Sequence, residues 1–150
     1  AIPFELRIKL DTLFRSVSYS HYSSALIDSI MAENKNQVNA KLYLHIQAFN
    51  FETIYTKGKE LILYNTFNYY TPEDFIFYTL FVCEQLHINT ETTETIIVGD
   101  IEKKSELYTI AQKYIKNIHF GKRIDDTDMM YQMQQIPKHN YYTLLNKYHL

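Results

Sequence analysis

The sequence predicts an α/β protein built on one mixed β-sheet that carries helices on its faces. Three observations support this class. Apolar and polar residues alternate from Ala40 to Ala48, which is typical of a strand with one buried face. Thr95–Val98 is a short apolar and β-branched run, the pattern of a strand buried on both faces. Apolar residues recur every three or four positions within Glu102–Lys116, which indicates an amphipathic helix.

The composition excludes several classes of function. The chain has 150 residues, 46% of them hydrophobic, and its net charge of −2 lacks the basic excess of a nucleic-acid binder. The uncharged run Phe75–Cys83 spans nine residues and is too short to cross a bilayer, and no signal peptide is recognisable. The single cysteine allows no intrachain disulfide. We therefore expect a cytoplasmic protein with no membrane span and no nucleic-acid partner.

The first part of the chain predicts a helix, a strand and a second helix. Pro3 begins a helix that places Leu6, Leu10, Leu13 and Phe14 on one face, although the alternation from Phe4 to Leu10 also allows a strand. Ser16–Tyr22 alternates as a short strand does. Ser23 or Ser24 then caps a helix, and the polar segment Asn34–Asn39 is the best internal boundary.

The remaining elements follow in order from Ala40. Strands are expected at Phe51–Thr56 and Glu60–Phe67, joined by a tight turn in which Gly58 supplies the positive φ. Thr71 is expected to cap a helix over Pro72–Leu86 by accepting the backbone N–H of Glu73 or Asp74. A last sheet strand is expected at residues 118–120 and a terminal helix at residues 140–148.

The order βββαβαβ is that of a ribonuclease H-like unit, in which three antiparallel strands are followed by strands that return through right-handed crossovers. A ferredoxin-like or other α+β sandwich accommodates the same elements. The expected outer face of the first strand carries Lys41, Tyr43, His45 and Gln47. The residues expected to point inward are Leu42, Leu44, Ile46, Ile96, Ile97 and Val98.

Several segments resemble a family of uncharacterised bacterial proteins of unknown function that is described as having an actin-like ATPase fold. They are Tyr64–Phe67, Thr71–Tyr78, Phe81–Leu86 and Gly99–Glu102 leading into Ser105–Tyr108. The resemblance implies two ribonuclease H-like halves. Residues 1–36 would be the end of the first half and residues 37–150 the second, with the rest of the first half missing from this chain.

The sequence lacks the residues that the enzymes of this architecture use. A ribonuclease H-like nuclease holds Mg²⁺ with carboxylates, one of them on the first strand, but Lys41–Phe49 contains no Asp or Glu. An actin-like ATPase needs a glycine-containing turn for phosphate, but the turn Gln47–Glu52 has no glycine, and Phe49 and Phe51 are expected to crowd the site. We therefore expect no nuclease activity, and we expect this half to lack a loop that holds phosphate.

Other candidate residues have simpler explanations. Gly99 and Asp100 are weak nucleotide candidates, and a turn with Asp100 as a helix cap is favoured for them. Glu73 and Asp74 fit capping rather than catalysis, and Cys83 fits the core. The six histidines show no metal-binding spacing, and the lysines around residues 103–122 fit a solvated face. We expect no catalytic residue, no metal and no cofactor.

The excess of aromatic residues is the feature that core packing explains least. We expect a partner surface formed by Tyr64, Phe67, Tyr69, Tyr70, Phe77 and Tyr78. The function expected is a non-catalytic interaction or scaffold module on a degenerate actin-like fold, whose partner is an unknown protein or a second copy of the chain. The alternative is a nucleotide-binding actin-like ATPase whose phosphate loop lies in the missing first half.

Overall fold

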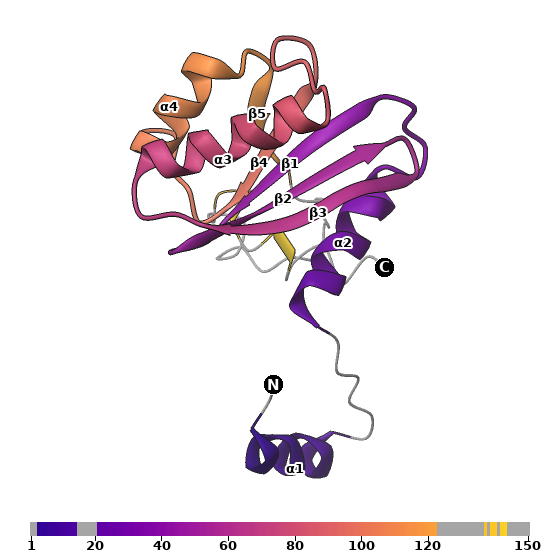
Figure 1. The fold of residues 1–150 in the computed structure, drawn as a ribbon. Coiled ribbons are helices and arrows are strands. Elements are labelled where there is room, and N and C mark those ends of the chain that lie inside the picture. Colours follow the sequence, from indigo (N-terminus) through magenta and orange to yellow (C-terminus); the bar gives the residue numbers. More distant parts are fainter. Residues whose placement is uncertain (1–2, 15–20, 123–136, 138, 141, 144–150) are drawn as a thin grey trace.

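A computed structural model describes residues 3–14, 21–122, 137, 139, 140, 142 and 143. These residues form a five-stranded mixed sheet and four helices (Figure 1). The elements, in chain order, are α1 (Phe4–Leu13), α2 (Tyr22–Glu33), β1 (Ala40–Ile46), β2 (Asn50–Lys57), β3 (Glu60–Asn68), α3 (Pro72–Gln85), β4 (Glu94–Gly99), α4 (Glu106–Tyr114) and β5 (Ile118–Phe120).

The strand order in the sheet is β3-β2-β1-β4-β5. The first three strands form the expected antiparallel meander, and Gly58 has φ +57° in the turn between β2 and β3. The strand β4 runs parallel to β1 on one side and to β5 on the other. The expected mixed sheet is therefore confirmed, and β4 lies inside it.

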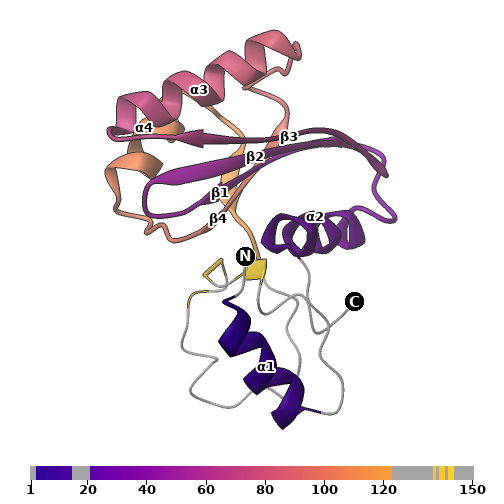
Figure 2. The ribbon, with the colours of Figure 1, turned by 60° about the horizontal axis from the view of Figure 1, so that its bottom comes forward.

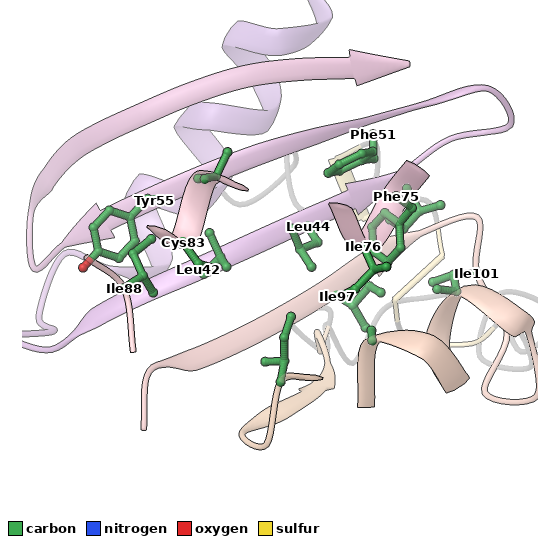
Figure 3. Packing of buried hydrophobic residues seen from close by; sticks show 14 residues of the cluster. Leu42, Leu44, Phe51, Tyr55, Phe75, Ile76, Cys83, Ile88, Ile97 and Ile101 are labelled. Carbon is green, nitrogen blue, oxygen red and sulfur yellow. The ribbon is translucent and has the colours of Figure 1, made fainter. Parts of the chain in front are cut away.

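Helices cover both faces of the sheet (Figures 1 and 2). On one face, α3 and α4 pack over Leu42, Leu44 and Ile97, with Phe51 and Phe75 beside them (Figure 3). On the other face, α2 contributes Leu26 and Ile30, which pack with Tyr43, Ile54, Ile96, Val98 and Tyr142. Two layers of apolar contacts thus hold the central strands, as the β-branched pattern of β4 indicates.

The expectation that β1 has an outer polar face is wrong. Tyr43 and His45 are buried, because α2 and the segment around Tyr142 cover that face. Tyr43 satisfies its hydroxyl by accepting a 2.7 Å hydrogen bond from the Asn34 side chain. Alternation in sequence shows which residues share a face, but it does not show what covers that face.

The start of α3 agrees with the expectation. The Thr71 hydroxyl accepts the backbone N–H of Asp74 at 3.1 Å, and the Asp74 carboxylate accepts the backbone N–H of Thr71 at 3.0 Å. This reciprocal arrangement is a capping box. Hydrogen bonds from the backbone N–H groups of Tyr70 and Thr71, opposed by slight desolvation, lower the pKa of Asp74.

The helix α4 is shorter than the expected span Glu102–Lys116. Ser105 caps it by accepting the backbone N–H of Tyr108 at 3.3 Å, so the helix begins at Glu106. It ends at Tyr114, and the chain becomes extended at Ile115.

Near the N-terminus the helical alternative is confirmed for α1, although no residue of α1 is buried. The expected cap of α2 is wrong: His21, not Ser23 or Ser24, is the N-cap, and its Nδ1 accepts the backbone N–H of Ser23 at 3.3 Å. The expected strand Ser16–Tyr22 does not reach Tyr22, which is helical, and its residues 16–20 lie outside the described part. The expected terminal helix lies mostly outside it as well.

Candidate functional site

A cavity of about 310 Å³ opens at the carboxyl ends of the two inner strands β1 and β4. Because these two strands are parallel, their carboxyl ends lie side by side. In open α/β sheets, ligands bind outside the carboxyl ends of the strands. The residues that line the cavity are Tyr22, His45, Ile46, Gln47, Ala48, Gly99, Asp100 and Asn140.

Gly99 ends β4 and is required by the backbone at this point. Its φ is +97°, a conformation that residues with a side chain rarely adopt. A Cβ atom at this position would also collide with the carbonyl oxygen of Ile46. The close approach of β1 and β4 explains this glycine without a ligand.

Asp100 does not cap a helix, so that interpretation is wrong. The nearest helix starts at Glu106 with Ser105 as its cap. Asp100 is instead exposed beside the cavity, and its backbone N–H donates to the carbonyl of Ile46 at 2.9 Å. Its carboxylate is therefore available at the cavity mouth.

A buried polar network lies behind the cavity. The His45 Nδ1 donates to the Glu52 carboxylate at 2.7 Å, and both side chains are buried. The Tyr22 hydroxyl lies 3.0 Å from His45 Nε2 and 3.2 Å from the Thr143 hydroxyl. The network thus ties β1 and β2 to α2 and to the segment near residue 143.

Glu52 accepts hydrogen bonds at both carboxylate oxygens. The Gln47 side chain donates to Oε2 at 3.2 Å, and the Tyr64 hydroxyl lies 2.9 Å from Oε1 and 2.7 Å from the Ser23 hydroxyl. Since Tyr64 has one hydroxyl proton, it donates to the carboxylate and accepts from Ser23. Burial alone would raise the pKa of Glu52, but the hydrogen bonds, led by that of His45, outweigh it and lower the pKa.

The turn between β1 and β2 has a different geometry from the one expected. Phe51 is buried under α3, and Phe49 points into solvent, so neither residue lines the cavity. The expectation that they crowd the site is wrong. The turn is instead held by Tyr69, whose hydroxyl donates to the carbonyl of Gln47 at 2.7 Å.

The six aromatic residues expected to form a partner surface lie in three different environments. Tyr64 belongs to the network on the α2 face of the sheet. Phe67, Tyr69 and Tyr78 are half-buried on the α3 face, where Phe67 stacks on Tyr78 with 5.1 Å between ring centroids. Two residues are exposed, and they are Tyr70 and Phe77.

A third exposed aromatic residue, Phe81, lies one helical turn after Phe77 on α3. We call Tyr70, Phe77 and Phe81 the aromatic corner; Tyr70 lies between β3 and α3, and Phe77 and Phe81 lie on α3 itself. Their exposed fractions are 87%, 63% and 47%. The ring centroids of Phe77 and Tyr78 are 5.4 Å apart, so the aromatic corner adjoins the half-buried aromatic residues on the α3 face of the sheet.

Two further reactive side chains, His139 and Cys83, are buried in the fold. His139 donates to the carbonyl of Ile101 at 2.7 Å, and its burial lowers its pKa. Burial also raises the pKa of the Cys83 thiol to about 11. Within the described residues, no group of three or more His, Cys, Asp or Glu side chains is arranged to hold a metal ion.

Sequence reasoning missed the His45 and Glu52 pair because it assigned His45 to solvent. A signal was present in the hairpin, since the turn after Ile46 places residue 45 directly opposite residue 52. A histidine and a carboxylate in cross-strand positions are expected to interact on either face of a sheet. The exposure of Phe77 and Phe81 follows from the helical phase of α3, whose buried face runs through Phe75 and Thr79.

Comparison with solved structures gives the class of the fold. The chain is similar to a crystal structure from Bacteroides thetaiotaomicron of a protein with an actin-like ATPase fold and unknown function. The TM-score is 0.65 and the identity is 23%, over 77% of this chain and 45% of that one. The chain therefore has the fold of part of an actin-like ATPase, and it spans less than half the length of the similar protein.

The family can also be stated. Residues 2–118 match the family described as proteins of unknown function, DUF3822, and the chain belongs to this family. The resemblance seen in the sequence is thereby confirmed. The comparison with curated proteins gives no match. Among the described residues, no helix combines the length and the apolar character that a membrane span requires.

Proposed function

We propose that this chain is a non-catalytic module that binds another protein through the aromatic corner. The observation that carries this proposal is the exposure of three large aromatic side chains, Tyr70 in the connection from β3 to α3 and Phe77 and Phe81 one turn apart on α3. Phenylalanine and tyrosine are enriched in protein contact surfaces, because burying their large rings on association is favourable. Large exposed aromatic side chains of this kind lower the solubility of the free protein unless a partner covers them.

The chemistry of the cavity agrees with a module that does no catalysis. Both oxygens of Glu52 already accept hydrogen bonds from neighbouring side chains, so its carboxylate stabilises the fold and is not placed to act on a ligand. The turn from Gln47 to Asn50 has no glycine and offers no phosphate loop.

A photo-crosslinking residue introduced at Phe77 tests the proposal in the cells that produce the protein. We expect a discrete crosslinked band that contains a protein partner. The matched control is the same residue at Tyr114, an aromatic position on α4 with a similar exposed fraction of 50%. Equal crosslinking at both positions would show that the aromatic corner has no special role.

Nucleotide binding is the second candidate, because the cavity lies at the strand ends and is lined by Gly99 and Asp100. A first half of the fold would then supply the phosphate loop. Mg-ATP at 100 times its dissociation constant would stabilise the protein by ~2.7 kcal/mol. A rise in Tm that is lost in Asp100→Ala supports this candidate, and an unchanged Tm at saturating Mg-ATP removes it.

The proposal includes the division of the chain. We assign residues 1–36 to the end of a first actin-like half and residues 37–150 to the second. The exposed apolar side chains of α1, among them Phe4 and Leu13, support this division, because they have the character of a helix that packs on another part. A cytoplasmic location fits the single free thiol of Cys83.

A further inference from the structure

The strand β3 lies at the edge of the sheet and pairs with β2 on one side. It is nine residues long, and no charged residue occurs from Leu61 to Pro72. Natural proteins protect long edge strands with lysine, proline, bulges or a covering segment, because unpaired backbone groups there accept another strand. Within Leu63–Asn68 the strand carries neither charge nor proline.

The direction of the outward backbone groups can be read from Thr66. Its N–H donates to the side chain of Asn65 at 2.9 Å and so points away from β2, and pairing with another strand would replace this local hydrogen bond. Because backbone groups alternate in direction along a strand, Tyr64 and Asn68 point outward as well. The register with β2 shifts at Tyr55, which leaves Ile62 without a cross-strand partner, so the regular part of the edge begins at Leu63.

We propose that β3 pairs antiparallel with β3 of a second copy of this chain, with the two-fold axis at Thr66. The three outward residues are centred on Thr66, so this register uses all of them. Thr66 faces Thr66 of the second copy, and Tyr64 faces Asn68. The two sheets then become one continuous sheet of ten strands. This inference rests on the proposed interaction function and names its partner.

Two features favour a second copy over another protein. The pairing is self-complementary, since it brings no charges together and opposes two threonines, a favourable cross-strand pair. The aromatic corner also lies on the β3 side of α3, because Phe67 of β3 stacks on Tyr78, which contacts Phe77. A strand added to β3 would extend the sheet beside these exposed rings and bring the α3 helix of the second copy toward them.

Cysteine crosslinking tests both the partner and the register. At the two-fold axis the Cα atoms of facing residues are about 5.5 Å apart, within the range of a disulfide. We expect Thr66→Cys to form a disulfide-linked dimer under mild oxidation. The matched control is Asn68→Cys, for which the equivalent residues lie about 14 Å apart and cannot be bridged. The unmodified chain controls for Cys83, which is buried.

Sedimentation velocity measures the association without a crosslink. We expect a concentration-dependent dimer whose dissociation constant rises at least tenfold in Thr66→Lys, because two ammonium groups would meet at the axis. In Thr66→Ala, which keeps the backbone N–H, we expect a change below threefold. Circular dichroism confirms that both variants are folded, and Asn68→Lys replaces Thr66→Lys as the charged variant if the latter is not.

The outcomes separate this inference from the proposed function. A monomer at all concentrations without a Thr66→Cys disulfide overturns the inference, and equal disulfide formation in Asn68→Cys overturns the register. If the chain is a monomer and Phe77 still crosslinks to a different protein, the interaction function stands and the second copy is wrong. If the dimer forms and Phe77 does not crosslink, the aromatic corner is not the binding surface.

Discussion

Replacing Glu52 by leucine tests the energetic role of the buried network. The variant removes the acceptor for the His45 Nδ1–H, the Tyr64 hydroxyl and the Gln47 side chain. Each buried donor left without an acceptor costs ~1–3 kcal/mol. Gln47 reaches the surface and can bond to water, and the Tyr64 hydroxyl can turn to donate to Ser23, so the His45 Nδ1–H is the donor that remains uncompensated. We expect Glu52→Leu to lower the free energy of unfolding by ~1–3 kcal/mol, the cost of leaving the buried His45 donor without an acceptor.

The assay is urea denaturation of Glu52→Leu, His45→Leu and the double variant. The double variant is expected to cost less than the sum of the single ones, since it leaves no unpaired partner and apolar side chains replace both polar groups. A cost below 1 kcal/mol for Glu52→Leu, or strict additivity in the double variant, would refute the network as a source of stability.

The same residue predicts a pH dependence. The pKa of Glu52 is lower in the folded protein than in the unfolded chain. Its contribution to stability is therefore complete above the unfolded pKa of about 4.5 and is lost as the pH falls through the folded pKa. In Glu52→Gln we expect a flatter loss of stability in acid. An acid denaturation curve parallel to that of the unchanged protein would contradict this.

Three further substitutions test the packing and the turns. Thr71→Ala should lower the free energy of unfolding by ~1 kcal/mol and Thr71→Ser by less, since serine keeps the cap; equal values would reject capping. Gly99→Ala should cost more than ~2 kcal/mol, because it adds a collision with Ile46 to an unfavourable φ; a Tm within error would contradict it. Ile97→Ala should cost ~2–5 kcal/mol in urea and Leu61→Ala, which is exposed, under ~0.5 kcal/mol; similar costs would reject the core assignment.

The elements that sequence predicts best are those whose signals are local. The cap at Thr71 and the turn at Gly58 depend on residues within four positions of one another, so their geometry follows from the sequence. The strand β4 was also recognisable, because burial on both faces leaves a continuous apolar run.

The features that sequence does not predict depend on segments that are distant in the chain. His45 is buried because α2 and residues near Thr143 cover its face of the sheet. Asp100 lines a cavity because the next helix is capped five residues later by Ser105. Tyr64 and Phe67 are three residues apart and therefore lie on opposite faces of β3, so they cannot belong to one surface. This result follows only when the segment is assigned as a strand and both faces of the sheet are known to be covered.

The position of β1 at the centre of the sheet has a kinetic consequence. One of its neighbours, β2, follows it directly, whereas the other, β4, pairs Glu94 with Lys41 after about fifty intervening residues. Loop closure of that length delays the second pairing relative to the first. We expect Ile54→Val, in the hairpin, to slow refolding, and Ile97→Val, in β4, mainly to speed unfolding. Until β4 pairs with it, the growing chain carries the largely buried strand β1 with one edge unpaired, so a nascent protein depends on the speed of that late pairing to avoid aggregation.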